Sequence, residues 1–391
     1  MTNKTLNTII IGAGIGGLVT ALCLAKKGLK SEIYEKTPEL SELGAGVQLS
    51  PNATKVLNYL GLLSELRKYT FEPQAFKFLN YKNKNIIAEQ SLGEEIEKKY
   101  GAPNYDVHRA DLQKVLLEEV KKQGIKIHTN SVVHDVSQDE TSAYIHTNER
   151  IVKGDLVIGA DGIHSLVRKK LWGDDKARFT GNVAWRMLVP VDHLPPNLLQ
   201  PNTTIWLGPN KHFVQYHVKN GTMLNCVCLV EQEGWTNENW AERGEIEELK
   251  ELYKGWHDSL QTLLEYSNPE SLYRWALHDR LPLKQWSKKR ITLLGDSAHP
   301  MLPFLAQGAA MAIEDGAVLA SSLASFSDCK LGLIDYESKR KIRTTMVQKK
   351  AARNAKIFHL SGLSAVMRNL VMNFAGKKIM NDLYNYDATD I

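Results

Sequence analysis

Cysteine is scarce in this 391-residue sequence, which contains only four, at positions 23, 226, 228 and 329. Four cysteines at these separations do not have the dense spacing of a disulfide framework. Cys226 and Cys228 alternate in the stretch MLNCVCLV, which is typical of a buried strand rather than of a metal site. No cluster of cysteine and histidine has zinc-binding spacing, so we expect no bound metal.

Long uninterrupted hydrophobic runs are also lacking. The apolar N-terminal stretch NTIIIGAGIGGLVTALCLAKKG has neither the basic start nor the cleavage site of a signal peptide, so we expect a cytoplasmic protein. In the apolar tail at 357–387, Gly362, Arg368, Gly376 and a pair of lysines interrupt any run of about 18 residues. The tail therefore predicts no membrane span. Packing against the insert described below or against a second subunit is favoured over contact with a membrane surface, and we expect a monomer or a homodimer.

The excess of positive charge is concentrated in a single segment. The net charge is +5, but residues 339–356 carry eight lysines and arginines and no acid, so the rest of the chain is slightly acidic. A solvated helix face is favoured for this segment over a patch that binds phosphate or a membrane. The remaining charges show no nucleic-acid footprint. With 43% hydrophobic and 24% charged residues, the composition is that of a globular enzyme with two or three domains.

A glycine-rich motif follows the first apolar segment. The apolar run at 7–11 precedes GAGIGG, and a helix-like segment comes next. In this G-x-G-x-x-G pattern Gly12 makes the tight turn, Gly14 lets a pyrophosphate approach the backbone, and Gly17 lets the helix pack on the strand. Glu35 ends the second strand, 18 residues beyond the last glycine, and can accept hydrogen bonds from an adenosine ribose. The combination predicts a dinucleotide site.

Two kinds of strand pattern follow one another along the chain, and their order predicts an interrupted domain. Short apolar segments, each followed by a glycine or polar turn, are expected to form one parallel sheet; they lie at 7–11, 31–35, 154–159 and 290–295. Alternating strand patterns and an Asn-Gly turn between the last two segments predict a β-rich insert. We therefore predict an α/β fold in which a Rossmann-like domain is interrupted by a β-rich substrate domain and followed by C-terminal helices. The predicted parts are 1–177, 178–283 and 284–391.

Three loops that contain glycine follow strands of the expected parallel sheet: GAGIGG, GADG at 159–162 and GDSAHP at 295–300. Ligands of such sheets bind at the carboxyl ends of the strands, so these loops are expected to hold the two halves of one long ligand. A helix begins near Gly308, and its first amides are unsatisfied donors with partial positive charge. Gly308 and Ala309 are small, which leaves room for a flat group.

Together these motifs resemble those of the FAD-dependent aromatic hydroxylases, which are single-component flavoprotein monooxygenases. The branch that contains salicylate hydroxylase and 3-hydroxybenzoate 6-hydroxylase is the most similar. The resemblance spans nearly the whole chain. It includes GAGIGG at 12–17, ELGAGVQLSPNA at 42–53, VHRADL at 107–112, GDLVIGADGIHSLVR at 154–168, GDSAHPMLPFLAQGAAMAIEDG at 295–316 and LYNYDA near the end.

The resemblance implies a bound FAD and a transient NADH or NADPH. Arg109 would contact the phosphate or ribityl region, and Asp161 belongs to a motif between FAD and NAD(P)H. Asp296 would hydrogen-bond the ribityl chain, and the amides that follow Gly308 would stabilise the reduced flavin anion. His299 is not expected to be catalytic. The implied cofactor-binding residues are Gly12, Gly14, Gly17, Glu35, Lys36, Arg109, Asp161, Asp296, Gly308 and Ala309.

The implied reaction is hydroxylation of a small, salicylate-like phenolic or aromatic acid. In the family that the sequence resembles, NAD(P)H reduces FAD, and the reduced FAD activates O2 for transfer of OH to the ring, so the same chemistry would be expected here. A deprotonated phenol reacts better, so a base is expected, and the resemblance places substrate-handling residues at His212 and Tyr216. Arg186 offers a carboxylate clamp or, equally, a structural ion pair. Pro303 stands where 3-hydroxybenzoate 6-hydroxylases tend to have Gln, which favours the salicylate-like pattern, so the catalytic candidates are His212, Tyr216 and Pro303.

Two other functions stay open at this point. One is a flavin hydroxylase of a larger substrate, such as a polyketide, a quinolone or an antibiotic. The other is an FAD-binding protein that does not hydroxylate. A compact chain without an appended domain favours a small substrate, and a nearly complete set of flavin-reduction motifs argues against the non-hydroxylating alternative.

Overall fold

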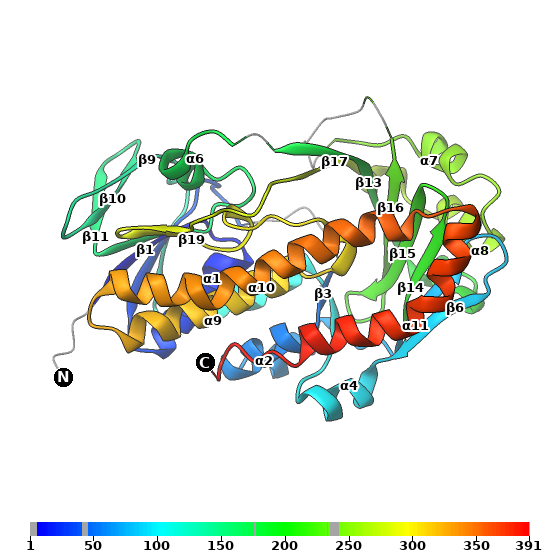
Figure 1. Ribbon diagram of the computed structural model, residues 1–391, viewed down its shortest axis with the longest axis horizontal. Coiled ribbons are helices and arrows are strands. Elements are labelled where there is room, and N and C mark those ends of the chain that lie inside the picture. Colours follow the sequence, from blue (N-terminus) through cyan, green and yellow to red (C-terminus); the bar gives the residue numbers. More distant parts are fainter. Residues whose placement is uncertain (1–5, 41–45, 176, 233, 235–241, 391) are drawn as a thin grey trace.

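The computed structural model describes residues 6–40, 46–175, 177–232, 234 and 242–390. Residues 42–45, which begin the motif at 42–53, lie outside this part of the chain. Two large sheets lie toward opposite ends of the long axis, and the long helix α10, Cys329–Phe358, runs between them (Figure 1).

The first large sheet has the order β18-β19-β12-β1-β2-β8. Neighbouring strands are parallel except for the short pair β18–β19. Apolar side chains fill the central strands because other elements cover them. In sheet order the strands are Ser287–Lys288, Ile291–Leu293, Leu156–Gly159, Asn7–Ile11, Lys30–Tyr34 and Lys126–His128. The four expected strands are confirmed, and the structure adds β8 and β18 to them.

The second large sheet has the order β17-β13-β16-β15-β14-β5-β6. Its pairs are antiparallel except β14–β5. In sheet order the strands are Tyr273–Asp279, Arg178–Pro190, Met223–Glu231, Lys211–Val218, Asn202–Gly208, Ala75–Asn80 and Ile86–Ser91. The Asn-Gly turn between β15 and β16 is confirmed, with positive φ at Asn220 and Gly221. The division at residues 177 and 283 stays a prediction, and the sheet also draws β5 and β6 from the segment before it.

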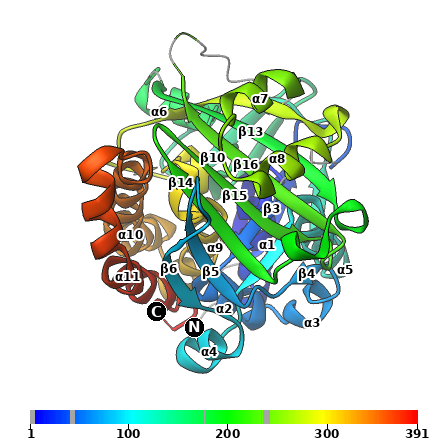
Figure 2. The ribbon, with the colours of Figure 1, turned by 90° about the vertical axis from the view of Figure 1, so that its right-hand side faces the viewer.

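The two faces of the second sheet pack against different elements. Helices α7, Ile246–Leu252, and α8, Asp258–Glu265, cover the outer face (Figure 2). Phe213 joins a hydrophobic cluster there with residues of both helices. On the inner face Leu207 and Leu229 pack with residues of the 3-10 helix η5, Pro303–Leu305, and of α10. This inner face is therefore turned toward the loop that precedes α9, Gly308–Ser325.

The remaining elements connect and cover these sheets. Helix α1 packs on α9, and the strands β9, β10 and β11 form a meander beside β1 and β12. A small sheet, β3-β7-β4, joins the halves through contacts of β7 with β15. The elements are α1 (Ile15–Lys26), β3 (Gly46–Leu49), α2 (Pro51–Tyr59), α3 (Leu63–Leu66), β4 (Thr70–Phe71), α4 (Gly93–Tyr100), β7 (Tyr105–His108), α5 (Arg109–Lys122), β9 (Val133–Gln138), β10 (Ala143–Thr147), β11 (Ile151–Gly154), α6 (Leu166–Trp172) and α11 (Gly362–Tyr384).

The basic segment in α10 differs from the expected solvated face. Arg340 and Arg343 are buried, and both pair with the buried carboxylate of Glu314 in α9, at 2.5 and 2.7 Å. Part of the basic cluster therefore compensates charges inside the protein, where an unpaired carboxylate would be strongly unfavourable. The prediction of a solvated face is wrong for these two arginines. Within the described residues, no helix is long and apolar enough to cross a membrane.

Candidate active site

The GAGIGG loop connects β1 to α1 in the conformation that its glycines predict. Gly12 has φ +106°, in the region that favours glycine. A Cβ at Gly12 would collide with the carbonyl oxygen of Ala160, and a Cβ at Gly17 would collide with the carbonyl oxygen of Gly12. A Cβ at Gly14 would meet no protein atom within 4 Å. The fold therefore requires Gly12 and Gly17, whereas the space beside Gly14 is open to a ligand.

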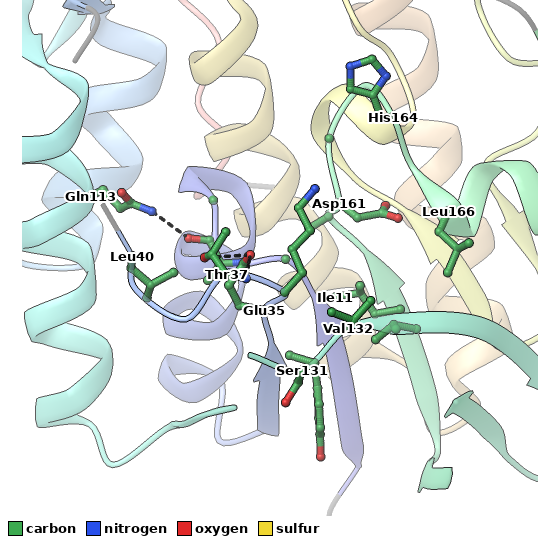
Figure 3. Close-up of a pocket in the computed structure, with 18 of the residues that line it drawn as sticks. Ile11, Glu35, Thr37, Leu40, Gln113, Ser131, Val132, Asp161, His164 and Leu166 are labelled. Atoms are coloured by element: carbon green, nitrogen blue, oxygen red, sulfur yellow. Dashed lines mark hydrogen bonds between the residues drawn. The ribbon is translucent and has the colours of Figure 1, made fainter. Parts of the chain in front are cut away.

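A cavity of about 430 Å³ lies beside this loop (Figure 3). Glu35 lines it, and Oε2 of Glu35 accepts a hydrogen bond from the Ala13 amide at 2.8 Å. Oε1 of Glu35 accepts from the Thr37 amide at 2.9 Å. These bonds hold the carboxylate next to the glycine loop, where a dinucleotide ribose binds in this fold. Lys36 also lines the cavity.

Arg109 and Asp161 line the same cavity from two other elements. Arg109 is the first residue of α5. Asp161 follows β12 and accepts hydrogen bonds from Ser165 Oγ at 2.5 Å and from the Val167 amide at 3.2 Å. Burial raises the pKa of Asp161 above its usual range, although these hydrogen bonds oppose the rise. Asp161 thus lines the cavity, and its hydrogen bonds also hold the start of α6.

Asp296 lies in the 3-10 turn η4, Gly295–Ser297, after β19. Its side chain is exposed, whereas Gly295 and Ser297 on either side of it are buried. Desolvation by the surrounding protein raises the pKa of Asp296, and the charges of His299 and Arg109 oppose that rise. The exposed carboxylate therefore lies within electrostatic reach of Arg109, a residue of the cavity. This arrangement fits a residue that contacts the same extended cofactor.

His299, in the same loop, is part of the packing. Its Nε2 lies 2.6 Å from Oδ2 of Asp315 in α9, and both side chains are buried. Asp315 also accepts hydrogen bonds from Arg340 Nε at 2.7 Å and from the Gly295 amide at 3.0 Å. Burial alone would raise the pKa of Asp315, but the charges of His299 and Arg340 lower it to about 2. His299 therefore ties the loop to α9 and α10.

Helix α9 begins directly after a strained turn. Ala306 has φ +52°, a conformation that residues other than glycine rarely adopt. The side chain of Gln307 holds the turn, since its Oε1 accepts a hydrogen bond from Asn52 Nδ2 at 3.0 Å. The next residues, Gly308 and Ala309, carry amides of the first helical turn. A Cβ at Gly308 would meet its nearest neighbour only at 3.9 Å, so space for a flat ligand remains beside it.

Other predicted residues gather on the inner face of the second sheet. Arg186 is only 4% exposed, and its guanidinium carbon lies 5.6 Å from the centroid of the Tyr273 ring and 5.4 Å from that of Trp275. Throughout the described part of the chain, Arg186 forms no hydrogen bond or ion pair through its side chain. Burial, and to a lesser degree the charge of Arg109, lower the pKa of Arg186. The structural ion pair considered for Arg186 is thus not found among these residues.

Tyr216 lies on β15 beside the small sheet. A Cβ at Gly46 would come within 2.6 Å of the Tyr216 hydroxyl, so glycine at this position makes room for the tyrosine. Burial raises the pKa of Tyr216, and the charge of Asp106 raises it further. The Tyr216 hydroxyl therefore keeps its proton at neutral pH and can donate a hydrogen bond.

His212 lies on the same face as Tyr216, four residues earlier on β15. It is 2% exposed, and its Nδ1 lies 2.8 Å from Nε2 of His359. Burial, and then the charge of His359, lower the pKa of His212 well below its ordinary value, so the ring is neutral at neutral pH. Its ring centroid is 5.2 Å from that of Phe304. Pro303, one residue before, is exposed, so the contact of this loop with His212 that the structure shows is made by Phe304.

Comparison with known proteins identifies the family. Residues 5–351 match the family model of the FAD binding domain. The 3-hydroxybenzoate 6-hydroxylase 1 of Aquipseudomonas alcaligenes is 36% identical over 370 residues, covering 94% of this chain and 93% of that protein. The 3-amino-4-hydroxybenzoate 2-monooxygenase PtnB3 of Streptomyces platensis is 34% identical over 352 residues, covering 90% and 88%. This chain belongs to the FAD-dependent aromatic hydroxylases.

Solved structures support the same fold. HpxO of Klebsiella pneumoniae, complexed with FAD and uric acid, superposes with a TM-score of 0.87 at 24% identity, covering 97% of this chain and 96% of that chain. A salicylate hydroxylase substrate complex superposes with a TM-score of 0.84 at 22% identity, covering 100% and 97%. The predicted fold class, the flavoprotein monooxygenase class and FAD as the cofactor are confirmed. The open space at Gly14 and the exposed Asp296 carboxylate suit this cofactor.

Some residues of the site carry no recognisable sequence signal. His359 contacts His212 from 147 positions away, and Glu231 contacts His359 from 128 positions away. Gln307 and Asn52 meet across 255 positions. No spacing rule links such pairs, because they depend on how α9 and α10 pack against the sheets.

Proposed function

We propose that this protein hydroxylates a small aromatic acid with a phenolic hydroxyl group, using O2 and either NADH or NADPH. The observation that carries the proposal is the buried guanidinium of Arg186, which shares a sheet face with His212 and Tyr216. By their names, the relatives described above act on a hydroxybenzoate and an aminohydroxybenzoate. Such molecules combine a carboxylate with a phenol, which are the two groups that this face can bind.

A buried guanidinium without a counter-charge is unfavourable, because the lost hydration is not replaced. The rings of Tyr273 and Trp275 replace only part of it through cation–π contacts. A substrate carboxylate would supply the missing partner with two parallel hydrogen bonds. The nearby charge of Arg109 adds to the positive potential that attracts such an anion.

The protein's own residues would bind the ring and control its phenolic proton. His212 is neutral at neutral pH and can accept that proton, which makes the ring more electron-rich. Tyr216 keeps its own proton and can donate a hydrogen bond to a substrate oxygen. Phe304 and its apolar neighbours limit the entry of water. FAD, when bound, supplies the reduction by NAD(P)H and the activation of O2.

A monohydroxybenzoate is the substrate class that these groups fit. Pro303 favours a salicylate-like compound, whereas the hydroxybenzoate relative named above is a 3-hydroxybenzoate 6-hydroxylase. Both compounds carry a carboxylate and a phenol, so Arg186 and His212 would act on either in the same way.

We also propose that NAD(P)H binds transiently near Asp161, and that the protein is cytoplasmic and a monomer or homodimer. The single dinucleotide motif supports a transient site for the nicotinamide co-substrate. Four buried free cysteines suit a reducing compartment.

The test is to supply FAD-loaded protein with hydroxybenzoates and with their methyl esters, and to measure NADH and NADPH oxidation together with the hydroxylated product. We expect turnover of the acids and little of the esters. Arg186→Met should raise KM for the acid and leave the ester unchanged. Arg178→Met is the matched control, since Arg178 lies on the same strand but is exposed and pairs with Asp279. Equal turnover of acid and ester would contradict the role of Arg186, and oxidation without product would contradict the function.

A further inference from the structure

A chain of three polar side chains lies on the inner face of the second sheet. Nδ1 of His212 lies 2.8 Å from Nε2 of His359, and Nδ1 of His359 lies 2.8 Å from Oε1 of Glu231. These residues come from β15, the end of α10 and the end of β16. Both histidines are buried, whereas the side chain of Glu231 is 45% exposed. The chain therefore connects a buried imidazole to solvent.

When Glu231 is ionised, only one assignment of donors and acceptors is possible along this chain of hydrogen bonds. A carboxylate only accepts, so Nδ1 of His359 must donate to it. A neutral His359 then has a bare Nε2, which accepts the Nδ1 proton of His212. A neutral His212 is left with a lone pair on Nε2, to which no described residue forms a hydrogen bond. The chain therefore selects the tautomer of His212 that can act as a base.

The surroundings keep both rings neutral. Burial has the largest effect on the pKa of His212 and lowers it, and the charge of His359 lowers it further. Burial also lowers the pKa of His359; Glu231 opposes this effect, and the charge of Arg368 in α11 reinforces it. The hydroxyl of Tyr253 donates to the His212 carbonyl oxygen at 2.8 Å, and burial raises its pKa, so it keeps its proton. Neutral imidazoles can pass a proton, since each has one N–H and one bare nitrogen.

We propose that His212, His359 and Glu231 form a proton relay between the bound substrate and solvent. The relay rests on the proposed function, in which a phenol gives its proton to His212. The phenolic O–H bond breaks as the proton binds Nε2 of His212, and the Nδ1 proton of His212 passes to Nε2 of His359. The Nδ1 proton of His359 passes to Glu231, which releases it to water, and no electron is transferred. A proton that returns along the same path restores both tautomers.

Within this relay the three residues have different roles. His212 contacts the substrate and is the catalytic residue. His359 and Glu231 are positioning residues, because they fix the tautomer of His212 and carry its proton outward.

The relay can be tested on a bound ligand without turnover. A nitro-substituted hydroxybenzoate changes its absorbance when its phenol ionises, so rapid mixing with FAD-loaded protein reports the rate of ionisation. We expect Glu231→Gln and His359→Gln to slow ionisation at least about tenfold and to raise the pH at which half of the ligand is ionised. Affinity at high pH should not change. Glu251→Gln removes an exposed charge paired with Lys254 and should behave as the wild type.

Wild-type ionisation rates and pH profiles in both variants would overturn the relay, because a merely structural His359 would change only stability. If the variants fail to fold, nitrogen NMR of histidine-labelled wild-type protein decides the question. The relay requires a protonated Nδ1 and a bare Nε2 on His212, and the opposite tautomer would overturn it. A wild-type protein that ionises the ligand as described but hydroxylates no phenolic acid would support the relay and refute the proposed function.

Discussion

The cavity beside the glycine loop and the inner face of the second sheet are built in different ways. The cavity is shaped mainly by the backbone: a turn with positive φ at Gly12, the Ala13 amide that holds Glu35, and open space beside Gly14. On the inner face, side chains supply the chemistry. Arg186, His212 and their neighbours come from β13, β15, β17, η5 and α10.

Under the proposed function, the first region would bind the cofactor and the second would select the substrate. The glycine loop tolerates no larger residue at Gly12 or Gly17, because a Cβ there would collide with backbone atoms. A face made of side chains can change its chemistry while the sheet pairing is retained. We therefore expect variants of the two regions to fail in different ways: loss of fold or flavin in the first, and loss of product with flavin retained in the second.

The largest effect is expected at the glycine loop. Gly17→Ala should prevent stable folding, because its Cβ would collide with the Gly12 carbonyl group. Gly14→Ala should fold, since its Cβ meets no protein atom, but should lose most of the FAD because the methyl group fills the space for the pyrophosphate. Circular dichroism and flavin absorbance measure the two outcomes. Full FAD content in Gly14→Ala would show that the pyrophosphate binds elsewhere.

The next largest effect is expected on the inner face. His212→Ala should keep its fold and FAD, while hydroxylation falls by ~10²–10⁴-fold, as is usual when a general base is lost. Reducing equivalents should then appear as hydrogen peroxide, and the defect should lessen at high pH, where more phenolate is present. Product and peroxide are measured per NAD(P)H consumed, with the exposed His193→Ala as the control. If the amount of product per NAD(P)H were unchanged and only the melting temperature fell, His212 would be a structural residue and not the base.

A smaller effect is expected at Asp296, the exposed carboxylate in the turn that follows β19. Asp296→Ala removes one charged hydrogen-bond partner, which corresponds to roughly 10- to 100-fold weaker FAD binding. The sheet should stay intact because the side chain is exposed. Flavin titration measures the change, and Asp192→Ala, another exposed aspartate, is the control. Wild-type FAD affinity in Asp296→Ala would remove this residue from the cofactor site.

The smallest effect concerns stability against pH. The folded protein keeps His212 neutral, whereas in the unfolded chain a histidine takes up a proton below about pH 6.5. The unfolded state then binds more protons, so the free energy of unfolding should fall as the pH drops from 7 to 5, by at most about 1.4 kcal/mol per pH unit for this group. His212→Gln should show a weaker dependence in urea unfolding. Other buried groups, such as Asp106, whose pKa burial raises to about 7, are common to both proteins.

The same contrast explains what could be predicted from the sequence. The parallel strands, the Asn-Gly turn and the glycine loop follow from local patterns, because turns and short apolar runs are encoded by neighbouring residues. The resemblance to the family points to His212 and Tyr216, and strand alternation places both on one face of a strand. Arg186 is a candidate because a guanidinium can bind a carboxylate. Whether Arg186 has an ion-pair partner depends on what packs against the strand, and the sequence left both possibilities open.

Long-range contacts were beyond the reach of sequence patterns. The contribution of β5 and β6 to the second sheet depends on a parallel pairing with β14, more than a hundred residues away. The sequence does not predict the burial of Arg340 and Arg343 against Glu314, because a run of basic residues is typical of a solvated helix face. The link from His212 through His359 to Glu231 is not predicted either, because it depends on packing between residues more than a hundred positions apart.

The central claim is that this flavoprotein inserts oxygen into a phenolic acid bound on the inner face. The most direct measurement supplies FAD-loaded protein with NAD(P)H, isotopically labelled O2 and a monohydroxybenzoate, and analyses the product by mass spectrometry. The account predicts NAD(P)H oxidation that the substrate accelerates, and a product that carries one labelled oxygen atom for each NAD(P)H consumed. NAD(P)H consumption that yields only hydrogen peroxide with every hydroxybenzoate would contradict it.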